Sequence, residues 1–325
     1  MKAVYLWETK TTSEKITFGS TFWKRTTLDP QISTYVPALI ELGYDPRGSV
    51  YDALLKPGQK PSKKGESPES YGARCLAAIA KEPSRYYARG IVTRLESDLR
   101  KASADAWNTA SQMREAKRLR IFPRNPDACI AWSRECDYLD VCAGLADIDD
   151  PLLFKHEPAN VELDGSDDMT LLSQSAMRSY RSCPQKFEFR YIKRRRTLKK
   201  AETLETGSSI HIALDAFRKS EGDLAVALAA LVTEDPYKRA KEAAMITGYA
   251  AYWGKPVGIL AIEKSFRIPL INPETGAASR TWELGGKVDA IVDADAIKEL
   301  TNPAKATTLE EQLQASIEED ENGEG

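Results

Sequence analysis

The alternation of apolar and polar side chains predicts strands at both ends of the chain. Residues 3–8 place successive side chains on opposite faces of an extended segment, which is the pattern of a strand. Residues 48–56 predict a second strand. Residues 258–271 and 280–293 predict two more, joined by a Pro-Glu-Thr-Gly turn. Strands therefore open the chain and return near its end.

Apolar side chains at helical spacing predict helices between these strands. The predicted helices cover residues 20–42, 69–81, 94–119, 173–193, 207–219 and 223–253. Two segments lack this periodicity: 57–68, rich in Pro, Gly, Lys and Ser, predicts a linker, and 145–170 predicts a connector. The end of the chain, 296–325, becomes strongly acidic and predicts a disordered tail.

Composition narrows the class of protein. The 325 residues suffice for one large domain or two of ordinary size, and with a net charge of −2 only a local basic patch could attract nucleic acid. No apolar run is long enough to span a membrane and the start lacks a signal-peptide pattern, so we expect a cytoplasmic protein with no membrane partner. Five cysteines then predict thiols or metal ligands rather than disulfides, and two histidines exclude most His-rich metal sites.

Glu8 and Lys10 stand two residues apart on the first predicted strand, so their side chains share one face. A carboxylate beside an ammonium group suits metal-assisted cleavage of a phosphodiester. The carboxylate holds a hard cation, which generates hydroxide and neutralises charge that builds on the phosphate. The lysine orients the attacking water or stabilises the anionic transition state. The alternative is an ordinary solvated strand face.

Three further positions are candidates for the same chemistry. Asp289 interrupts an apolar strand, where an unpaired buried charge would be costly, although a strand end or hairpin turn also explains it. His211 follows Gly-Ser-Ser-Ile, interpreted as a turn, and opens a predicted helix; the alternative is a structural histidine. Gln31 and Tyr35 are four residues apart and therefore share a helix face. The alternative to a functional pair is an ordinary polar pair at the surface.

Four of the five cysteines form a three-plus-one set. Cys129, Cys136 and Cys142 fall within fourteen residues, and Cys183 stands alone in a Cys-Pro pair. Four thiolates can hold a [4Fe–4S] cluster or a tetrahedral Zn²⁺, and the spacing does not decide between them. Four unrelated buried thiols are the third alternative, since cysteine packs well in a core. The remaining Cys75 is predicted to be a core-facing residue of the helix over 69–81.

In rotated order, with residues 171–295 placed before 1–144, these motifs occur as Cys, His, Asp, Glu-x-Lys, Gln-x-x-x-Tyr and three Cys. This order resembles the RecB-like branch of the PD-(D/E)XK nuclease superfamily that carries a four-cysteine iron–sulfur cluster, similar to CRISPR-associated and phage exonucleases. The chain looks like a circular permutant of such a nuclease, opened at the hairpin between the Asp strand and the Glu-x-Lys strand. The resemblance covers nearly the whole chain except the connector 145–170 and the acidic tail 296–325.

The resemblance implies a restriction-endonuclease-like α/β fold, in which helices flank a mixed central sheet and a helical lobe holds the iron–sulfur cluster. Both halves of the chain would form one nuclease domain. The catalytic set that it implies is Glu8, Lys10, Asp289, His211, Gln31 and Tyr35. Within this set His211, Asp289 and Glu8 would hold Mg²⁺ or Mn²⁺, and Lys10 would position the water. The resemblance also favours a [4Fe–4S] cluster over Zn²⁺ at Cys129, Cys136, Cys142 and Cys183.

Two basic runs are candidate contacts for nucleic acid. Lys193, Arg194, Arg195 and Arg196 follow a helix that carries aromatic residues, and residues 85–89 read Arg-Tyr-Tyr-Ala-Arg. Basic groups bind phosphates and aromatic faces stack on unpaired bases. The alternative is a solvated charged face.

The leading hypothesis is a metal-dependent deoxyribonuclease, an exonuclease or end-processing enzyme. It would act on single-stranded DNA or DNA ends in replication, recombination, repair or CRISPR adaptation, with protein partners from such a complex. The alternative is a DNA-end-binding module or partner subunit that keeps the fold without the turnover. The opened hairpin could also re-form between two chains, which leaves both a monomer and a swapped dimer open.

Overall fold

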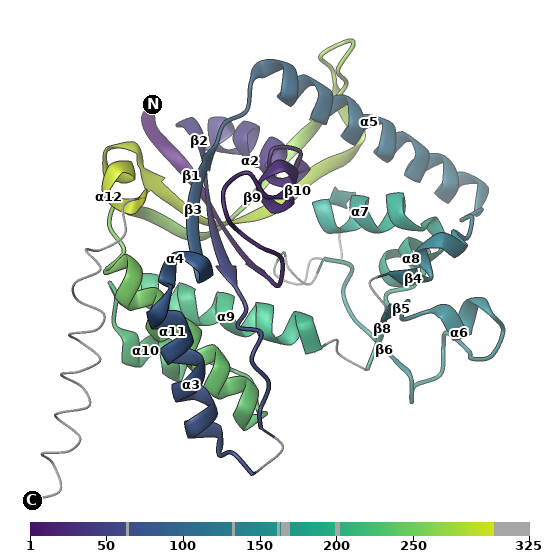
Figure 1. The fold of residues 1–325 in the computed structure, drawn as a ribbon. Helices are drawn as coiled ribbons and strands as arrows, with labels where there is room; N and C mark the ends of the chain where they lie inside the picture. Colours follow the sequence, from purple (N-terminus) through teal and green to yellow (C-terminus); the bar gives the residue numbers. More distant parts are fainter. Residues whose placement is uncertain (63–64, 132–133, 161–162, 164–169, 199–201, 302–325) are drawn as a thin grey trace, which may run out of the picture.

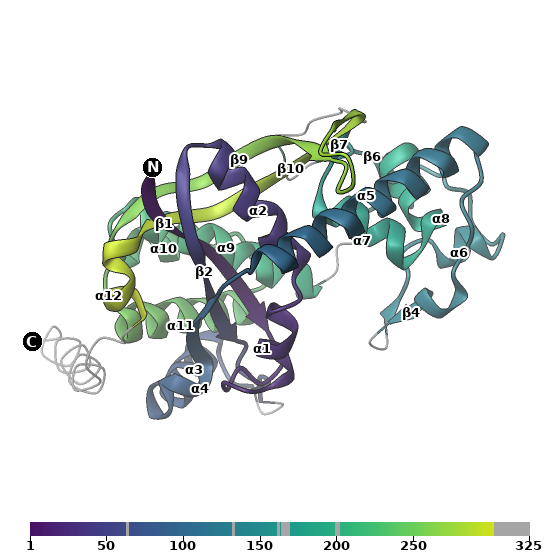
Figure 2. The same cartoon turned by 90° about the horizontal axis from the view of Figure 1, so that it is seen from above.

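The computed structural model describes residues 1–301 except 63–64, 132–133, 161–162, 164–169 and 199–201. A six-stranded mixed sheet forms its centre, and helices pack on both faces of the sheet (Figure 1). A smaller lobe of short elements lies to one side, and Figure 2 shows it apart from the sheet when the molecule is seen from above. This arrangement confirms the predicted mixed α/β fold with a central sheet flanked by helices.

The strands lie in the order β3-β2-β1-β10-β7, and β9 pairs with β10. Their bounds are β1 Lys2–Thr12, β2 Tyr44–Leu55, β3 Tyr87–Val92, β7 Leu171–Leu172, β9 Ile259–Ile271 and β10 Ala278–Asp293. β9 and β10 form an antiparallel hairpin, β10 is antiparallel to β1, and β1 is parallel to β2. The strands predicted from alternation are all present, whereas β3 and β7 were not predicted.

The first strand of the chain pairs directly with the last long one. In the antiparallel register of β1 and β10, Val4 lies opposite Asp293 and Trp7 lies opposite Ala290. An ion pair of 2.8 Å between Lys2 Nζ and Asp293 Oδ2 joins the ends of the two strands. The start of the chain therefore lies beside the end of the β9–β10 hairpin.

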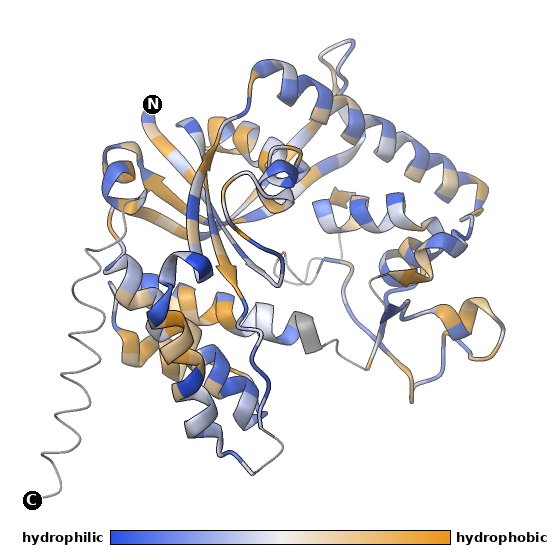
Figure 3. Ribbon diagram, viewed as in Figure 1, coloured by the Kyte–Doolittle hydropathy of each residue, from blue (hydrophilic) through white to orange (hydrophobic). Residues whose placement is uncertain are grey.

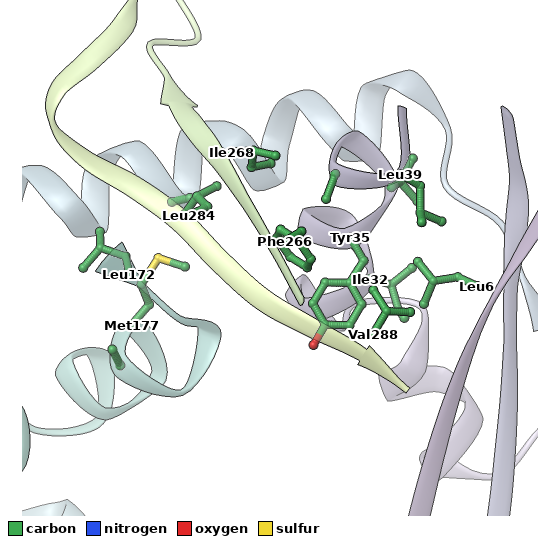
Figure 4. Packing of buried hydrophobic residues seen from close by; sticks show 14 of the residues in the cluster. Leu6, Ile32, Tyr35, Leu39, Leu172, Met177, Phe266, Ile268, Leu284 and Val288 are labelled. Atoms are coloured by element: carbon green, nitrogen blue, oxygen red, sulfur yellow. The ribbon is translucent and has the colours of Figure 1, made fainter. Parts of the chain in front are cut away.

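One face of the sheet is covered by α1 Thr21–Thr26, α2 Pro30–Glu41, α5 Glu96–Leu119 and α7 Gln174–Ser182. Figure 4 shows the core of this layer, where Ile32 and Tyr35 of α2 meet Phe266 and Val288 of the hairpin. The single helix predicted over 20–42 is wrong. A new helix begins at Pro30 because the Asp29 side chain accepts the backbone N–H of Gln31.

The other face is covered by α3 Pro68–Lys81, α4 Pro83–Tyr86, α9 Glu202–Lys219, α10 Leu224–Ala229 and α11 Pro236–Trp253. The helix predicted over 223–253 is two helices, since the Asp235 side chain caps a new one that begins at Pro236. Cys75 is fully buried in this layer, as predicted. The turn predicted before His211 is wrong because Gly207 and the residues after it lie inside α9.

The smaller lobe holds the three-cysteine segment and the segment around Cys183. Its elements are η1 Pro126–Ala128, β4 Ile130–Ala131, β5 Arg134–Glu135, α6 Leu139–Cys142, β6 Phe154–His156, α8 Pro184–Phe187, the π-helix η2 Glu188–Ile192 and β8 Arg195–Thr197. The continuous helix predicted over 173–193 is interrupted at Cys183, whose backbone is extended because Pro184 follows it. The predicted connector contributes strand β6 to this lobe.

The beginning of the predicted acidic tail is ordered. The short helix η3 Ala294–Ala296 is followed by α12 Ile297–Thr301, which places Leu300 in the core, so the prediction of disorder is wrong for 296–301. The rest of the predicted tail, 302–325, lies outside the described residues.

Figure 3 shows mostly hydrophilic colours along α5. No helix among the described residues is long and apolar enough to cross a membrane.

Candidate active site

Glu8 and Lys10 of β1 join Gln31 and Tyr35 of α2 in one chain of hydrogen bonds. Lys10 Nζ lies 2.5 Å from Glu8 Oε1 and 3.0 Å from Gln31 Oε1. Gln31 Nε2 donates to Glu8 Oε1 over 2.9 Å and to the Tyr35 hydroxyl over 2.8 Å, and this hydroxyl donates to the Lys287 carbonyl oxygen over 2.9 Å. Period-two spacing aligns Glu8 with Lys10 on the strand, and four-residue spacing aligns Gln31 with Tyr35 on the helix. The hydrogen bonds of Gln31 to Lys10 and Glu8 then join the two pairs.

Asp289 belongs to β10, the strand beside β1. Its side chain contacts β1 and lies near α9. Its Oδ2 accepts the backbone N–H of Thr9 over 2.8 Å. The same oxygen lies 3.7 Å from Nδ1 of His211, which stands in the middle of α9. Segments from both ends of the chain therefore contribute side chains to one site.

Burial dominates the electrostatics of Glu8, whose side chain is 3% exposed. Burial and then the Asp289 carboxylate raise the pKa of Glu8 to about 8, although Lys10 acts to lower it. Burial acts to lower the pKa of Lys10, but the carboxylates of Glu8 and Asp29 outweigh it and the pKa is raised. Burial lowers the pKa of His211 against the pull of Asp289, which favours the neutral imidazole.

A cleft of about 790 Å³ opens at this site and is lined by Gln31, Tyr35, His211 and Asp289 among others. Glu263 also lines the cleft and forms an ion pair with Lys287. Glu263 has a left-handed backbone conformation, with φ of 55°, inside strand β9. A residue other than glycine in this conformation typically costs about 1–3 kcal/mol, and such strained residues cluster at active sites, ligand clamps and switch regions.

The donor chemistry of the site fits a divalent cation. Glu8 Oε2 is buried and has no hydrogen-bond partner within the described residues, and a cation would offset this desolvation. Two carboxylates and a neutral imidazole suit Mg²⁺ or Mn²⁺. The described residues contain no group of three or more His, Cys, Asp or Glu side chains already arranged to hold a metal ion. The other oxygen of Glu8, Oε1, accepts hydrogen bonds from Lys10 and Gln31.

The four cysteines of the three-plus-one set line one pocket of about 230 Å³ in the smaller lobe; these are Cys129, Cys136, Cys142 and Cys183. All four are free thiols. Burial raises the pKa of Cys136 and Cys142, so both favour the protonated form. The thiols share a pocket, but within the described part of the chain no three of them stand together in position to hold a metal ion.

The basic run over residues 193–196 lies in the smaller lobe, and none of its members lines the 790 Å³ cleft. Arg195 is paired with Asp149 over 2.6 Å. The other basic run, 85–89, was predicted to contact nucleic acid, but the side chain of one of its two arginines is buried. The Arg89 side chain is only 6% exposed and pairs with Asp52, so it is not available to contact nucleic acid.

A buried polar network behind the site was not predicted from the sequence. Arg218 Nη2 donates to Thr9 Oγ1 over 2.7 Å and Nη1 donates to Asp215 Oδ1 over 3.0 Å. Arg218 stands seven residues after His211, which is two turns of α9. That spacing is a weak signal by itself, because many helices carry an arginine at such a position.

Comparison with known proteins gives one match. Residues 171–314 match the family model of the PD-(D/E)XK nuclease superfamily. The matched segment carries His211 and Asp289, whereas Glu8 and Lys10 lie at the other end of the chain. No curated protein and no solved structure matched the chain.

Proposed function

We propose that the protein is a metal-dependent deoxyribonuclease in which the two ends of the chain build one active site. The observation that carries the proposal is the pairing of β1 with β10, which puts Glu8 and Lys10 beside Asp289 and His211. The superfamily match to residues 171–314 supports the nuclease activity. The site supplies acidic, basic and imidazole groups at one cleft, as hydrolysis of a phosphodiester needs.

His211, Asp289 and Glu8 would hold Mg²⁺ or Mn²⁺. The bound cation would supply Lewis acidity and a hydroxide nucleophile at neutral pH. The ammonium group of Lys10 would stabilise the negative charge that builds on the phosphate in the transition state. Gln31 accepts a hydrogen bond from Lys10 and donates one to Glu8, so it keeps the ammonium and the carboxylate in a fixed relation.

The order of the elements supports a circular permutation. Three antiparallel strands, β9, β10 and β1, lie side by side and are followed through α2 by the parallel strand β2. The chain passes from β9 to β10 through a turn, but β10 and β1 are separated by nearly the whole sequence. Opening a β10–β1 hairpin and joining the old ends through residues 145–170 would give this order, with segments 171–295 and 1–144 forming one nuclease domain.

The smaller lobe is proposed to hold a [4Fe–4S] cluster, with Zn²⁺ as the alternative occupant. The shared pocket of the four cysteines supports this assignment, because residues far apart in the sequence contribute thiols to it. The cluster would join the segment around Cys142 to Cys183, which are the old ends of the proposed permutant.

The substrate is proposed to be DNA, single-stranded or at a free end, in replication, recombination, repair or CRISPR adaptation. Lys193, Arg194, Arg195 and Arg196 are proposed to contact its phosphates. The competing proposal is a DNA-end-binding module with the same fold. It is favoured by the hydrogen bonds that Lys10 and Gln31 donate to Glu8 Oε1, which leave only Oε2 for a cation. The described residues also contain no group of three or more His, Cys, Asp or Glu side chains arranged to hold a metal ion.

End-labelled single- and double-stranded DNA distinguishes the two proposals. Protein purified without oxygen is incubated with each DNA in Mn²⁺, in Mg²⁺ and in EDTA. The nuclease proposal predicts shortened labelled strands with either cation and none in EDTA. DNA that is bound while its labelled strands keep their full length under every condition would support the binding module and contradict the nuclease proposal.

A further inference from the structure

Arg218 is a buried guanidinium that connects the helix and the strand of the candidate active site. Its side chain is 3% exposed and donates to Thr9 Oγ1 over 2.7 Å. Arg218 belongs to α9, the helix that carries His211, whereas Thr9 is the middle residue of the Glu-x-Lys triplet on β1. One side chain therefore connects two of the three elements that carry the proposed metal ligands, α9 with His211 and β1 with Glu8.

Thr9 is the residue through which this connection reaches Asp289. The backbone N–H of Thr9 donates to Asp289 Oδ2 over 2.8 Å, and the Thr9 hydroxyl also accepts from Trp7 Nε1 over 3.2 Å. Thr9 is fully buried, so its hydroxyl has protein partners in place of bulk water. A shift of Thr9 would move the N–H group that orients Asp289.

The network behind Arg218 balances its charge. Asp52 is fully buried, accepts from Arg89 Nε over 2.9 Å and from the Tyr249 hydroxyl over 2.5 Å, and lies 3.7 Å from Arg218. The guanidinium of Arg218 also lies 5.3 Å from the ring centre of Trp7. Apolar residues of similar volume often replace buried ion pairs without loss of stability, so stability alone is a weak reason for this network.

We propose that Arg218 is a positioning residue for the metal ligands. By holding Thr9, it fixes the Asp289 carboxylate and the strand that carries Glu8 relative to His211. Groups that orient metal ligands typically change metal affinity or activity by about 10–100-fold when they are removed. The inference rests on the proposed function, because it assumes that these three side chains hold the cation.

Titration of Mn²⁺ alone into metal-free protein tests the inference without DNA. Arg218→Lys keeps the charge but loses the forked donor, and Thr9→Val removes the hydroxyl while it keeps the backbone N–H. Both variants are expected to bind Mn²⁺ about 10–100-fold more weakly. The double variant is expected to be no weaker than the worse single variant, because both changes break the same contact. In cleavage assays both variants are expected to need a higher Mn²⁺ concentration for half-maximal cleavage than the parent. At saturating Mn²⁺ their cleavage rate is expected to return to that of the parent.

Arg89→Lys is the matched control, since Arg89 shares the network through Asp52 but does not contact Thr9. This variant is expected to lower the thermal midpoint and to leave Mn²⁺ affinity unchanged. If Arg218→Lys fails to fold, Thr9→Val decides the question. Unchanged Mn²⁺ affinity in folded Thr9→Val, or equal weakening by Arg89→Lys, would overturn the inference alone. A parent protein that neither binds Mn²⁺ nor cleaves DNA would overturn the proposed function as well.

Discussion

Asp289 Oδ2 accepts a 2.8 Å hydrogen bond from the backbone N–H of Thr9, a residue 280 positions earlier in the chain. The bond crosses from β10 to β1, the two strands whose pairing brings the ends of the sequence together. It places a carboxylate of one chain end directly beside the Glu-x-Lys triplet of the other. The geometry of the proposed site therefore depends on this strand pairing.

The raised pKa of Glu8 predicts a pH-dependent stability of the metal-free protein. The pKa is about 8 in the folded protein and 4.5 for an ordinary glutamate, because burial disfavours the carboxylate. The contribution of Glu8 to stability is therefore fully present below pH 4.5 and is lost as the pH rises through 8. Urea unfolding in EDTA at several pH values measures this loss. Glu8→Gln is expected to lack it, and an identical pH profile in both proteins would contradict the prediction.

Tyr35→Phe is expected to impair both activity and stability. The hydroxyl accepts from Gln31 and donates to the Lys287 carbonyl oxygen, so its removal frees the side chain that holds Glu8 and Lys10. We expect roughly tenfold slower cleavage and a loss of about 1 kcal/mol in the free energy of unfolding.

Tyr237→Phe is the matched control for Tyr35→Phe. Its hydroxyl also donates to a backbone oxygen, that of Glu66, but it does not line the cleft. This variant should lose similar stability and keep its cleavage rate. Equal cleavage by the Tyr35→Phe and Tyr237→Phe proteins would show that the Tyr35 hydroxyl does not support the site.

The cysteine pocket predicts a bound cluster that depends on four thiols and not on the fifth. Protein prepared without oxygen should be brown and should contain iron and acid-labile sulfide. Alanine at any one of Cys129, Cys136, Cys142 and Cys183 should reduce the iron content, whereas Cys75→Ala should keep it. Colourless parent protein that contains zinc would support the Zn²⁺ alternative, and metal-free parent protein would contradict both.

The proposed permutation predicts that the rejoined order also folds. A chain with residues 170–301 first, then a Gly/Ser linker and residues 1–163, restores the unpermuted order. Figure 1 places α12 and the N-terminus on the same side of the molecule. A linker of about ten residues has a root-mean-square span of about 16–19 Å. We expect a soluble protein with the circular dichroism spectrum of the parent and metal-dependent cleavage. An unfolded product would argue against the permutation.

Short-range patterns were sufficient to predict much of the site. Glu8 and Lys10 are two residues apart on a strand, and Gln31 and Tyr35 are four apart on a helix, so each pair is fixed by local geometry. The strands were predicted for the same reason, because alternation records which side chains face the core.

Long-range contacts and helix breaks were harder to predict. Arg218 and Thr9 meet only because α9 packs on β1, and no local pattern encodes that contact. The breaks at Asp29 and Asp235 did have a local signal, since each aspartate precedes a proline and caps a new helix. Apolar periodicity on both sides of each break concealed this signal.

The most direct test of the central claim compares cleavage by variants on the two paired strands. Lys10→Met on β1 and Asp289→Asn on β10 change the proposed site. Lys2→Met and Asp293→Asn change the ion pair at the other end of the same strands, and so serve as matched controls. We predict that both site variants lose cleavage of end-labelled DNA in Mn²⁺ by at least about 100-fold, while both controls keep it. Full cleavage by folded Lys10→Met or Asp289→Asn protein would contradict a single active site built from both ends of the chain.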